Sequence, residues 1–235
     1  MNTAELFDKS WAFNLEERLE RSPSFTEEQF TITGKAAAAY GGKRNRDWWF
    51  DHGPKMIDNW VNWRKEHGWI LWETPDGEPA IELELNIILP GDIPVKMVID
   101  RIFVLPSGLL APVDLKTGSR MPEFPEQLGL YATGMELAYG PEFRPQWGFY
   151  WDAQKGTHGQ PQPLDMYTPQ YLSALYSEAI AGINAGSFLA KPANSCQNWC
   201  GQSRHCAAVG GAEAHIYDPA LNGKQLTLTV KGEMQ

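Results

Sequence analysis

The chain is poor in cysteine and has no long apolar run, and these two absences narrow its class. Three cysteines in 235 residues are too few, and odd in number, for a disulfide framework. No apolar stretch approaches the roughly 20 residues that span a bilayer. The first ten residues lack the basic and apolar regions of a signal peptide. We therefore expect a soluble cytoplasmic protein without a membrane partner.

Positive charge is also in short supply. The chain carries 20 lysines and arginines against 29 acidic residues, so its formal net charge is −9 at pH 7. This balance argues against a protein that coats nucleic acid passively, but it suits an enzyme with a local basic channel and acidic metal ligands. A hydrophobic fraction of 43% and ten tryptophans provide for a packed core. With no internal repeat, one α/β domain over residues 1–235 is the economical interpretation.

Hydrophobic periodicity predicts the order of the elements. Residues 1–79 form a mainly helical part, in which Pro54 suits the first turn of a helix ending near His67. The predicted core is 80–192, followed by a cysteine lobe at 193–210 and a tail at 211–235. Within the core we expect strands at 80–89, 95–104, 109–116 and 146–152, a helix at 124–139 and another that begins after Thr168.

The most informative stretch runs from Val98 to Gly118. Two strand-like runs flank the turn Pro106-Ser107-Gly108 and so predict a hairpin. A turn centred on Ser107 makes Asp100 and Asp114 directly opposed neighbours, and two carboxylates so close repel each other unless a cation lies between them. Lys116 leaves the same face of its strand as Asp114. Two acids and a lysine that converge indicate a divalent-metal hydrolysis site, most plausibly for phosphodiesters.

This hairpin, its Asp-Leu-Lys-Thr-Gly strand and the following Gln127-Leu-Gly-Leu-Tyr131 segment resemble the PD-(D/E)xK nuclease superfamily. Within it they look like the RecB-type exonuclease branch, which includes the CRISPR-associated adaptation exonucleases and many phage-encoded relatives. The resemblance implies an α/β, restriction-endonuclease-like fold with a mixed central sheet flanked by helices. It implies a metal-dependent DNA exonuclease of recombination or repair type, with a recombinase or helicase as a partner. An endonuclease, or an accessory nucleic-acid-binding module that retains the fold, is the alternative.

Carried over to this chain, the resemblance makes Asp100 and Asp114 ligands of Mg²⁺ or Mn²⁺, to which Leu115 adds its carbonyl oxygen. Lys116 orients the attacking water and offsets charge on the phosphate. Gln127 and Tyr131, four residues apart, share a helix face that borders the active site and the DNA.

Two features depart from the family pattern. The His or Glu that relatives carry after a glycine on the preceding helix has no counterpart, because Pro54 to Ile57 follow Gly53. Glu82, Glu84 or Asp58 is expected to replace it, with Glu82 first. The glycine that commonly precedes the first aspartate is also absent.

Cys196, Cys200 and Cys206 match the C-terminal trio that holds a four-iron cluster in many relatives, but the fourth, N-terminal cysteine is missing. Because such a cluster normally needs four ligands, we expect none that is intact. Zinc bound with His205 and a metal-free lobe remain open alternatives.

A basic segment precedes paired tryptophans. Lys43, Arg44 and Arg46 followed by Trp48 and Trp49 suit phosphate contact with base stacking. A solvated basic loop beside two core tryptophans is the alternative interpretation.

Overall fold

The computed structural model describes residues 2–24, 26–27, 44–118, 121–187, 206 and 209–210. The chain divides into two compact units, Met1–Leu172 and Ser173–Gln235. The predicted aspartates and lysine all lie in the first unit. The predicted boundaries of the cysteine lobe and tail fall mostly outside the described residues and stay predictions. Within the described residues, no helix has the length and apolar character that crossing a bilayer requires.

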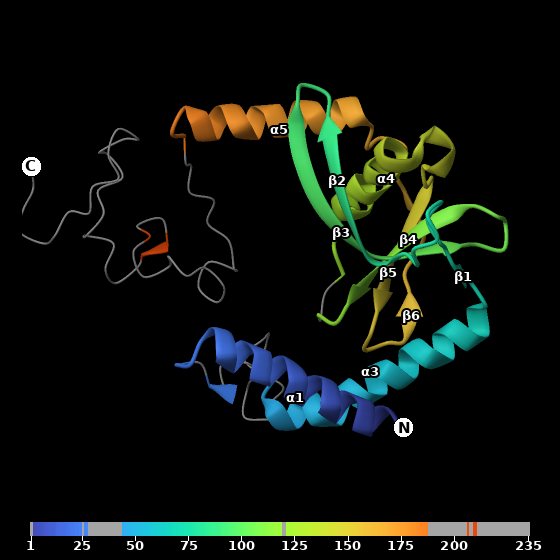
Figure 1. The fold of residues 1–235 in the computed structure, drawn as a ribbon, viewed down its shortest axis with the longest axis vertical. Helices are drawn as coiled ribbons and strands as arrows, with labels where there is room; N and C mark the ends of the chain where they lie inside the picture. The colour runs from blue at the N-terminus through green and yellow to red at the C-terminus, as the bar shows by residue number, and fades with distance from the viewer. Residues whose placement is uncertain are drawn as a thin grey trace, which may run out of the picture. The chain divides into compact units, whose positions relative to one another are not determined.

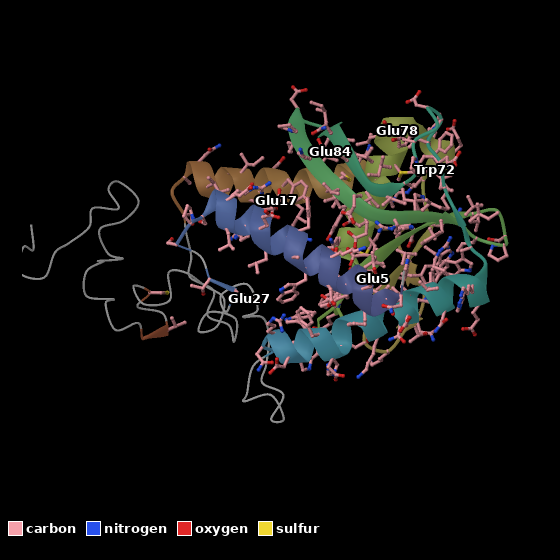
Figure 2. All side chains as sticks on the ribbon, turned by 60° about the horizontal axis from the view of Figure 1, so that its bottom comes forward. Glu5, Glu17, Glu27, Trp72, Glu78 and Glu84 are labelled. Atoms are coloured by element: carbon pink, nitrogen blue, oxygen red, sulfur yellow. The ribbon has the colours of Figure 1, made fainter. Side chains whose placement is uncertain are left out.

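Two helices form the N-terminal part. Helix α1 covers Thr3–Arg21 and helix α3 covers Arg46–His67, and they lie against each other in Figure 1. A Cβ atom added at Gly53 would lie 2.1 Å from the Phe7 ring, so glycine permits this close approach. The polar side of α1 carries Glu5 and Glu17, which pair with basic residues one turn later and are labelled in Figure 2.

The predicted start of the second helix was wrong. Asn45 caps α3, since its side-chain oxygen accepts a 3.0 Å hydrogen bond from the Trp48 amide. Pro54 therefore lies inside the helix rather than in its first turn. A strong cap nine residues upstream and the packing of the Trp48 side of α3 outweigh the backbone hydrogen bond that a proline removes.

A mixed sheet forms the centre of the first unit. Its strands are β1 (Ile70–Leu71), β2 (Ile81–Leu89), β3 (Ile93–Val104), β4 (Leu110–Lys116), β5 (Trp147–Asp152), β6 (Thr157–His158) and β7 (Gln162–Pro163). The order is β1-β3-β4-β5-β6, with β2 paired to β3 and β7 paired to β5. Only β4 and β5 run parallel among these pairs. The predicted α/β class with a mixed sheet is confirmed.

Helix α4 (Glu126–Tyr139) covers one face of the sheet. Two of its glycines permit close packing: a Cβ added at Gly134 would lie 2.4 Å from Met97 Sδ, and one at Gly129 would lie 2.1 Å from the Tyr167 ring. Figure 1 shows α4 behind the long curved pair formed by β2 and β3. A short 3₁₀ helix at Pro141–Phe143 follows α4, and helix α5 begins later at Pro169 and ends at Asn184.

Helix α3 covers the opposite face through aromatic packing. Trp60 and Trp63 lie within 4.9–6.3 Å of the ring centroids of Phe103 and Trp151. Val113 of β4 belongs to this aromatic core. Because side chains alternate along a strand, the next residue, Asp114, faces α4 instead.

The aromatic core includes a histidine whose ring is locked in one tautomer. Trp63 Nε1 donates a 3.0 Å hydrogen bond to His158 Nδ1. The His67 ring lies 5.0 Å from the His158 ring, centroid to centroid. Burial, and secondarily the neighbouring His67, lowers the pKa of His158 below its ordinary value. The folded protein therefore favours the neutral form of His158.

This environment predicts a pH-dependent loss of stability. The unfolded chain takes up a proton at His158 at a higher pH than the folded chain, so the melting temperature should fall as pH drops from about 7.5 to about 5.5. His158→Asn keeps an acceptor for the Trp63 N–H but cannot titrate, so it should flatten this slope. Thermal melts of His158→Asn and of the control His52→Asn, at several pH values, check the prediction. Equal slopes in the His158→Asn and wild-type proteins would contradict it.

Candidate active site

The β3–β4 hairpin brings the two predicted aspartates together. Its ladder pairs Arg101 with Val113 and Val104 with Leu110, which centres the turn on Ser107 as predicted. One step beyond this ladder, Asp100 stands opposite Asp114. Asp100 Oδ2 accepts a 2.8 Å hydrogen bond from the Leu115 amide. Asp100 is therefore held against β4, beside Asp114.

Asp114 is the most buried acid of the site, with 1% of its surface exposed. It lies on the face of β4 that α4 covers, opposite Tyr150 of the neighbouring strand β5. Lys116 Nζ lies 2.6 Å from Asp114 Oδ2, close enough for an ion pair. Oδ2 is buried and accepts no well-formed hydrogen bond within the described residues, so its partner is the Lys116 charge.

Four side chains form a closed chain of polar contacts. Lys116 Nζ donates to Gln127 Oε1 at 2.8 Å, and Gln127 Nε2 donates to the Tyr131 hydroxyl at 2.8 Å. The Tyr131 hydroxyl donates to Asp114 Oδ1 at 3.4 Å, and Asp114 pairs with Lys116. Gln127 and Tyr131, four residues apart on one face of α4 as predicted, thus link this helix to Asp114 and Lys116 of β4.

Burial sets the electrostatics of this ring. Burial raises the pKa of Asp114 above its usual range, and the Asp100 charge raises it further, whereas Lys116 and Tyr131 lower it. Burial and then the two aspartate charges raise the pKa of Tyr131 well above its ordinary value. The Tyr131 hydroxyl therefore keeps its proton and stays a donor. The ring and Asp100 together hold two carboxylates and one ammonium, so one negative charge is left over for a further cation.

The residues present fit a hard divalent cation. Asp114 Oδ2 is buried and lacks a donor, and Asp100 contributes a second carboxylate beside it. Carboxylate oxygens are the ligands that Mg²⁺ and Mn²⁺ prefer. Only two acidic side chains meet here, and no group of three or more His, Cys, Asp or Glu is found within the described part of the chain. Carbonyl oxygens, water or phosphate would have to complete the ligand set.

Glu82, predicted first among the substitute ligands, lies on the exposed side of β2. Its carboxylate pairs with Arg101 at 3.2 Å, and its backbone has a φ of 49°, a left-handed conformation that is unusual in a strand. Glu84 pairs with Lys96 at 2.8 Å on the same exposed side and is labelled in Figure 2. Metal ligation by Glu82, and by the Leu115 carbonyl, stays a prediction.

The predicted basic segment lies at the start of α3, and Arg44, just before this helix, contacts the backbone that follows Lys116. Arg44 is buried, its guanidinium lies 4.4 Å from the Trp48 ring centroid, and it donates a 3.1 Å hydrogen bond to the Thr117 carbonyl. Arg46 pairs with Glu27 at 2.8 Å. Lys43 lies outside the described residues. Contact of these three with DNA stays a prediction, and Trp48 belongs to the core, as the alternative interpretation held.

Two of the three predicted cysteines lie outside the described residues. Cys206 is described and carries a free thiol. Cys196, Cys200 and His205 lie outside the described residues. Ligation of iron or zinc by this segment stays a prediction.

Sequence reasoning missed two contributors. Tyr150 lies beneath Lys116, with Nζ 5.5 Å from the ring centroid, and its hydroxyl donates to the Phe124 carbonyl at 3.2 Å. Gln154 donates to the carbonyls of Thr117 and Gly118. Neither has a spacing signal in the sequence, because the parallel β4–β5 pairing that brings them in joins segments more than thirty residues apart.

Comparisons with known proteins agree with this geometry. Residues 5–207 match the PD-(D/E)XK nuclease superfamily. The chain is 32% identical over 190 residues to the Gene 69 protein of Mycobacterium phage D29. The matched region covers 80% of this chain and 67% of the phage protein. The chain is also 28% identical over 240 residues to the Gene 69 protein of Mycobacterium phage L5. That match covers 86% of this chain and 81% of the phage protein. The aspartate-lysine hairpin, the mixed sheet and the match over most of the chain agree: the chain belongs to the PD-(D/E)XK nuclease superfamily.

Proposed function

We propose that this protein is a metal-dependent DNA exonuclease that hydrolyses phosphodiester bonds from DNA ends. The observation that carries the proposal is the closed ring of Asp114, Lys116, Gln127 and Tyr131 with Asp100 beside it. An accessory module without activity would have no use for a buried, under-compensated carboxylate next to a lysine. Such a group lowers stability and is kept where it serves a reaction.

In this proposal Asp100 and Asp114 hold Mg²⁺ or Mn²⁺, with the Leu115 carbonyl and Glu82 as further oxygen donors. The ion supplies Lewis-acid polarisation of the phosphate and a more acidic water. Lys116 places a positive charge beside the reacting phosphate and orients the attacking water. Gln127 fixes the Lys116 ammonium through its Oε1 contact, and Tyr131 fixes Gln127.

The phage relatives support a place in phage DNA metabolism. Both are named by gene number, so their names assign no activity. We propose a recombination or repair role, in which a recombinase or helicase supplies or receives the DNA end. The resemblance to the RecB-type branch supports this role.

Degradation from ends is the test of this function. We expect linear DNA to be degraded with Mg²⁺ or Mn²⁺, without sequence preference, because phosphate contacts carry no sequence information. Covalently closed circular DNA of the same sequence should persist. Raising the salt from about 50 to about 200 mM should reduce the rate by an order of magnitude or more. Circular DNA cut as fast as linear DNA would instead assign an endonuclease.

A further inference from the structure

The backbone carbonyls of Lys116, Thr117 and Gly118 all accept hydrogen bonds. The Lys116 carbonyl accepts a 2.9 Å hydrogen bond from the Ala153 amide, at the end of the parallel β4–β5 pairing. The chain then leaves the sheet toward α4 through Thr117 and Gly118. Where a strand ends, its backbone groups lose the hydrogen bonds of the sheet. The position of the Lys116 side chain therefore depends on which groups bind the carbonyls of Thr117 and Gly118.

Gln154 supplies that hold. Its Nε2 group donates to the Thr117 carbonyl and to the Gly118 carbonyl, at 2.9 Å in each case. Arg44 adds a 3.1 Å hydrogen bond to the Thr117 carbonyl. Three successive carbonyls, beginning with that of Lys116, thus accept hydrogen bonds. A primary amide is suited to this task because its two N–H groups serve two acceptors at once.

Gln154 is itself fixed in place. Asp152 is buried and its Oδ1 accepts from the amides of Gln154 and Lys155, at 3.0 and 3.1 Å. This contact closes a turn of the kind that aspartate stabilises. Asn59 of α3 donates to the Ala153 carbonyl at 2.9 Å. The turn after β5 is therefore tied both to its own aspartate and to the helix behind the sheet.

From this geometry, and on the basis of the proposed function, we propose that Gln154 is a positioning residue. With Arg44 it fixes the Lys116–Gly118 backbone and so aims the Lys116 ammonium at the reacting phosphate. Gln154 acts through Lys116 and does not touch the substrate. Its loss leaves Lys116 present but less precisely placed, and small misplacements of catalytic groups slow reactions strongly.

Gln154→Ala tests this role, and Gln162→Ala is the matched control. Gln162 is also a glutamine whose amide donates to one backbone carbonyl, that of Gln160, away from the strand end. We expect Gln154→Ala to lower kcat on linear DNA about 10- to 100-fold, with KM and Mn²⁺ affinity unchanged. Gln162→Ala should match the wild type. Gln154 is exposed and Gln162 is only half-buried, so neither substitution should impair folding.

Two further measurements separate positioning from general damage. Gln154→Glu has the same shape but sets a carboxylate against two carbonyls, so it should lose more activity than Gln154→Ala. In a Lys116→Ala background, Gln154→Ala should remove no further activity, because the residue it positions is gone. An independent, multiplying loss in the double variant, or a Gln154→Ala enzyme as fast as Gln162→Ala, would overturn the inference.

Hydrogen exchange tests the positioning role of Gln154 independently of DNA cleavage. A wild-type protein that cleaves no DNA with any metal would refute the exonuclease proposal alone. Amide exchange over residues 115–118 would still report on the backbone hold. We expect faster exchange there in Gln154→Ala than in the wild type or Gln162→Ala. Equal exchange in all three proteins would refute the positioning role.

Discussion

Replacing Lys116 by alanine is expected to reduce DNA cleavage on the order of 10²- to 10³-fold while metal binding survives. The Lys116 ammonium lies 2.6 Å from Asp114 Oδ2 and donates a hydrogen bond to Gln127. Alanine removes the charge that offsets the phosphate in the transition state but leaves both metal-binding carboxylates. Single-turnover cleavage of linear DNA, with calorimetric titration of Mn²⁺, measures the two effects separately.

Lys96→Ala is the matched control for this substitution. Lys96 is also a strand lysine that pairs with an acid, Glu84, at 2.8 Å, but on the exposed side of the sheet. Its loss should leave the cleavage rate close to that of the wild type, as surface substitutions generally have small effects. A Lys116→Ala protein that degrades DNA as fast as Lys96→Ala would mean that the site has been assigned wrongly.

Asp114→Asn is expected to abolish cleavage and, in metal-free buffer, to raise the melting temperature. The raised pKa of Asp114 means that the fold favours its neutral form. The stability that Asp114 contributes through its protonated carboxyl group is therefore present below the usual aspartate pKa and is lost as pH rises through the folded pKa. Asparagine supplies a neutral side chain of the same shape at every pH. A gain of about 1 kcal/mol, or roughly 2–4 °C, is the expected scale near neutral pH.

Metal should reverse the order of stability in this experiment. Mn²⁺ bound to the native carboxylates stabilises the wild type by mass action, whereas Asp114→Asn has lost a ligand. Glu84→Gln is the control, because the Glu84 carboxylate is stabilised by Lys96 and its pKa is lowered. Thermal melts with EDTA and with Mn²⁺ measure all three proteins. If Asp114→Asn melts below the wild type in EDTA, the claim of an under-compensated carboxylate is incorrect.

Local patterns were enough to predict the centre of the site. The Pro106-Ser107-Gly108 turn fixes a hairpin register, and a register places Asp100 opposite Asp114 without knowledge of the rest of the fold. Gln127 and Tyr131 share a helix face because they are four residues apart, and they contact each other as that spacing requires.

Local sequence patterns could not predict the long-range contacts. Arg44 reaches the Thr117 carbonyl across 73 residues, and Gln154 reaches it across 37. Neither distance leaves a periodic signal. The helix start at Arg46 was missed because Pro54 suggested a later one, and the packing that allows an internal proline is tertiary. Local sequence thus predicts which groups meet at the candidate site, whereas the fold decides what holds them in place.

If two aspartates and a lysine form a metal-dependent phosphodiesterase site, withdrawal of the metal should stop DNA cleavage. Protein freed of metal with EDTA is assayed on linear DNA before and after addition of Mg²⁺ or Mn²⁺, with Asp114→Asn alongside. We expect no cleavage without metal, full recovery by the wild type when metal is added, and no recovery by Asp114→Asn. Cleavage that persists in EDTA, or that Asp114→Asn retains, would contradict it.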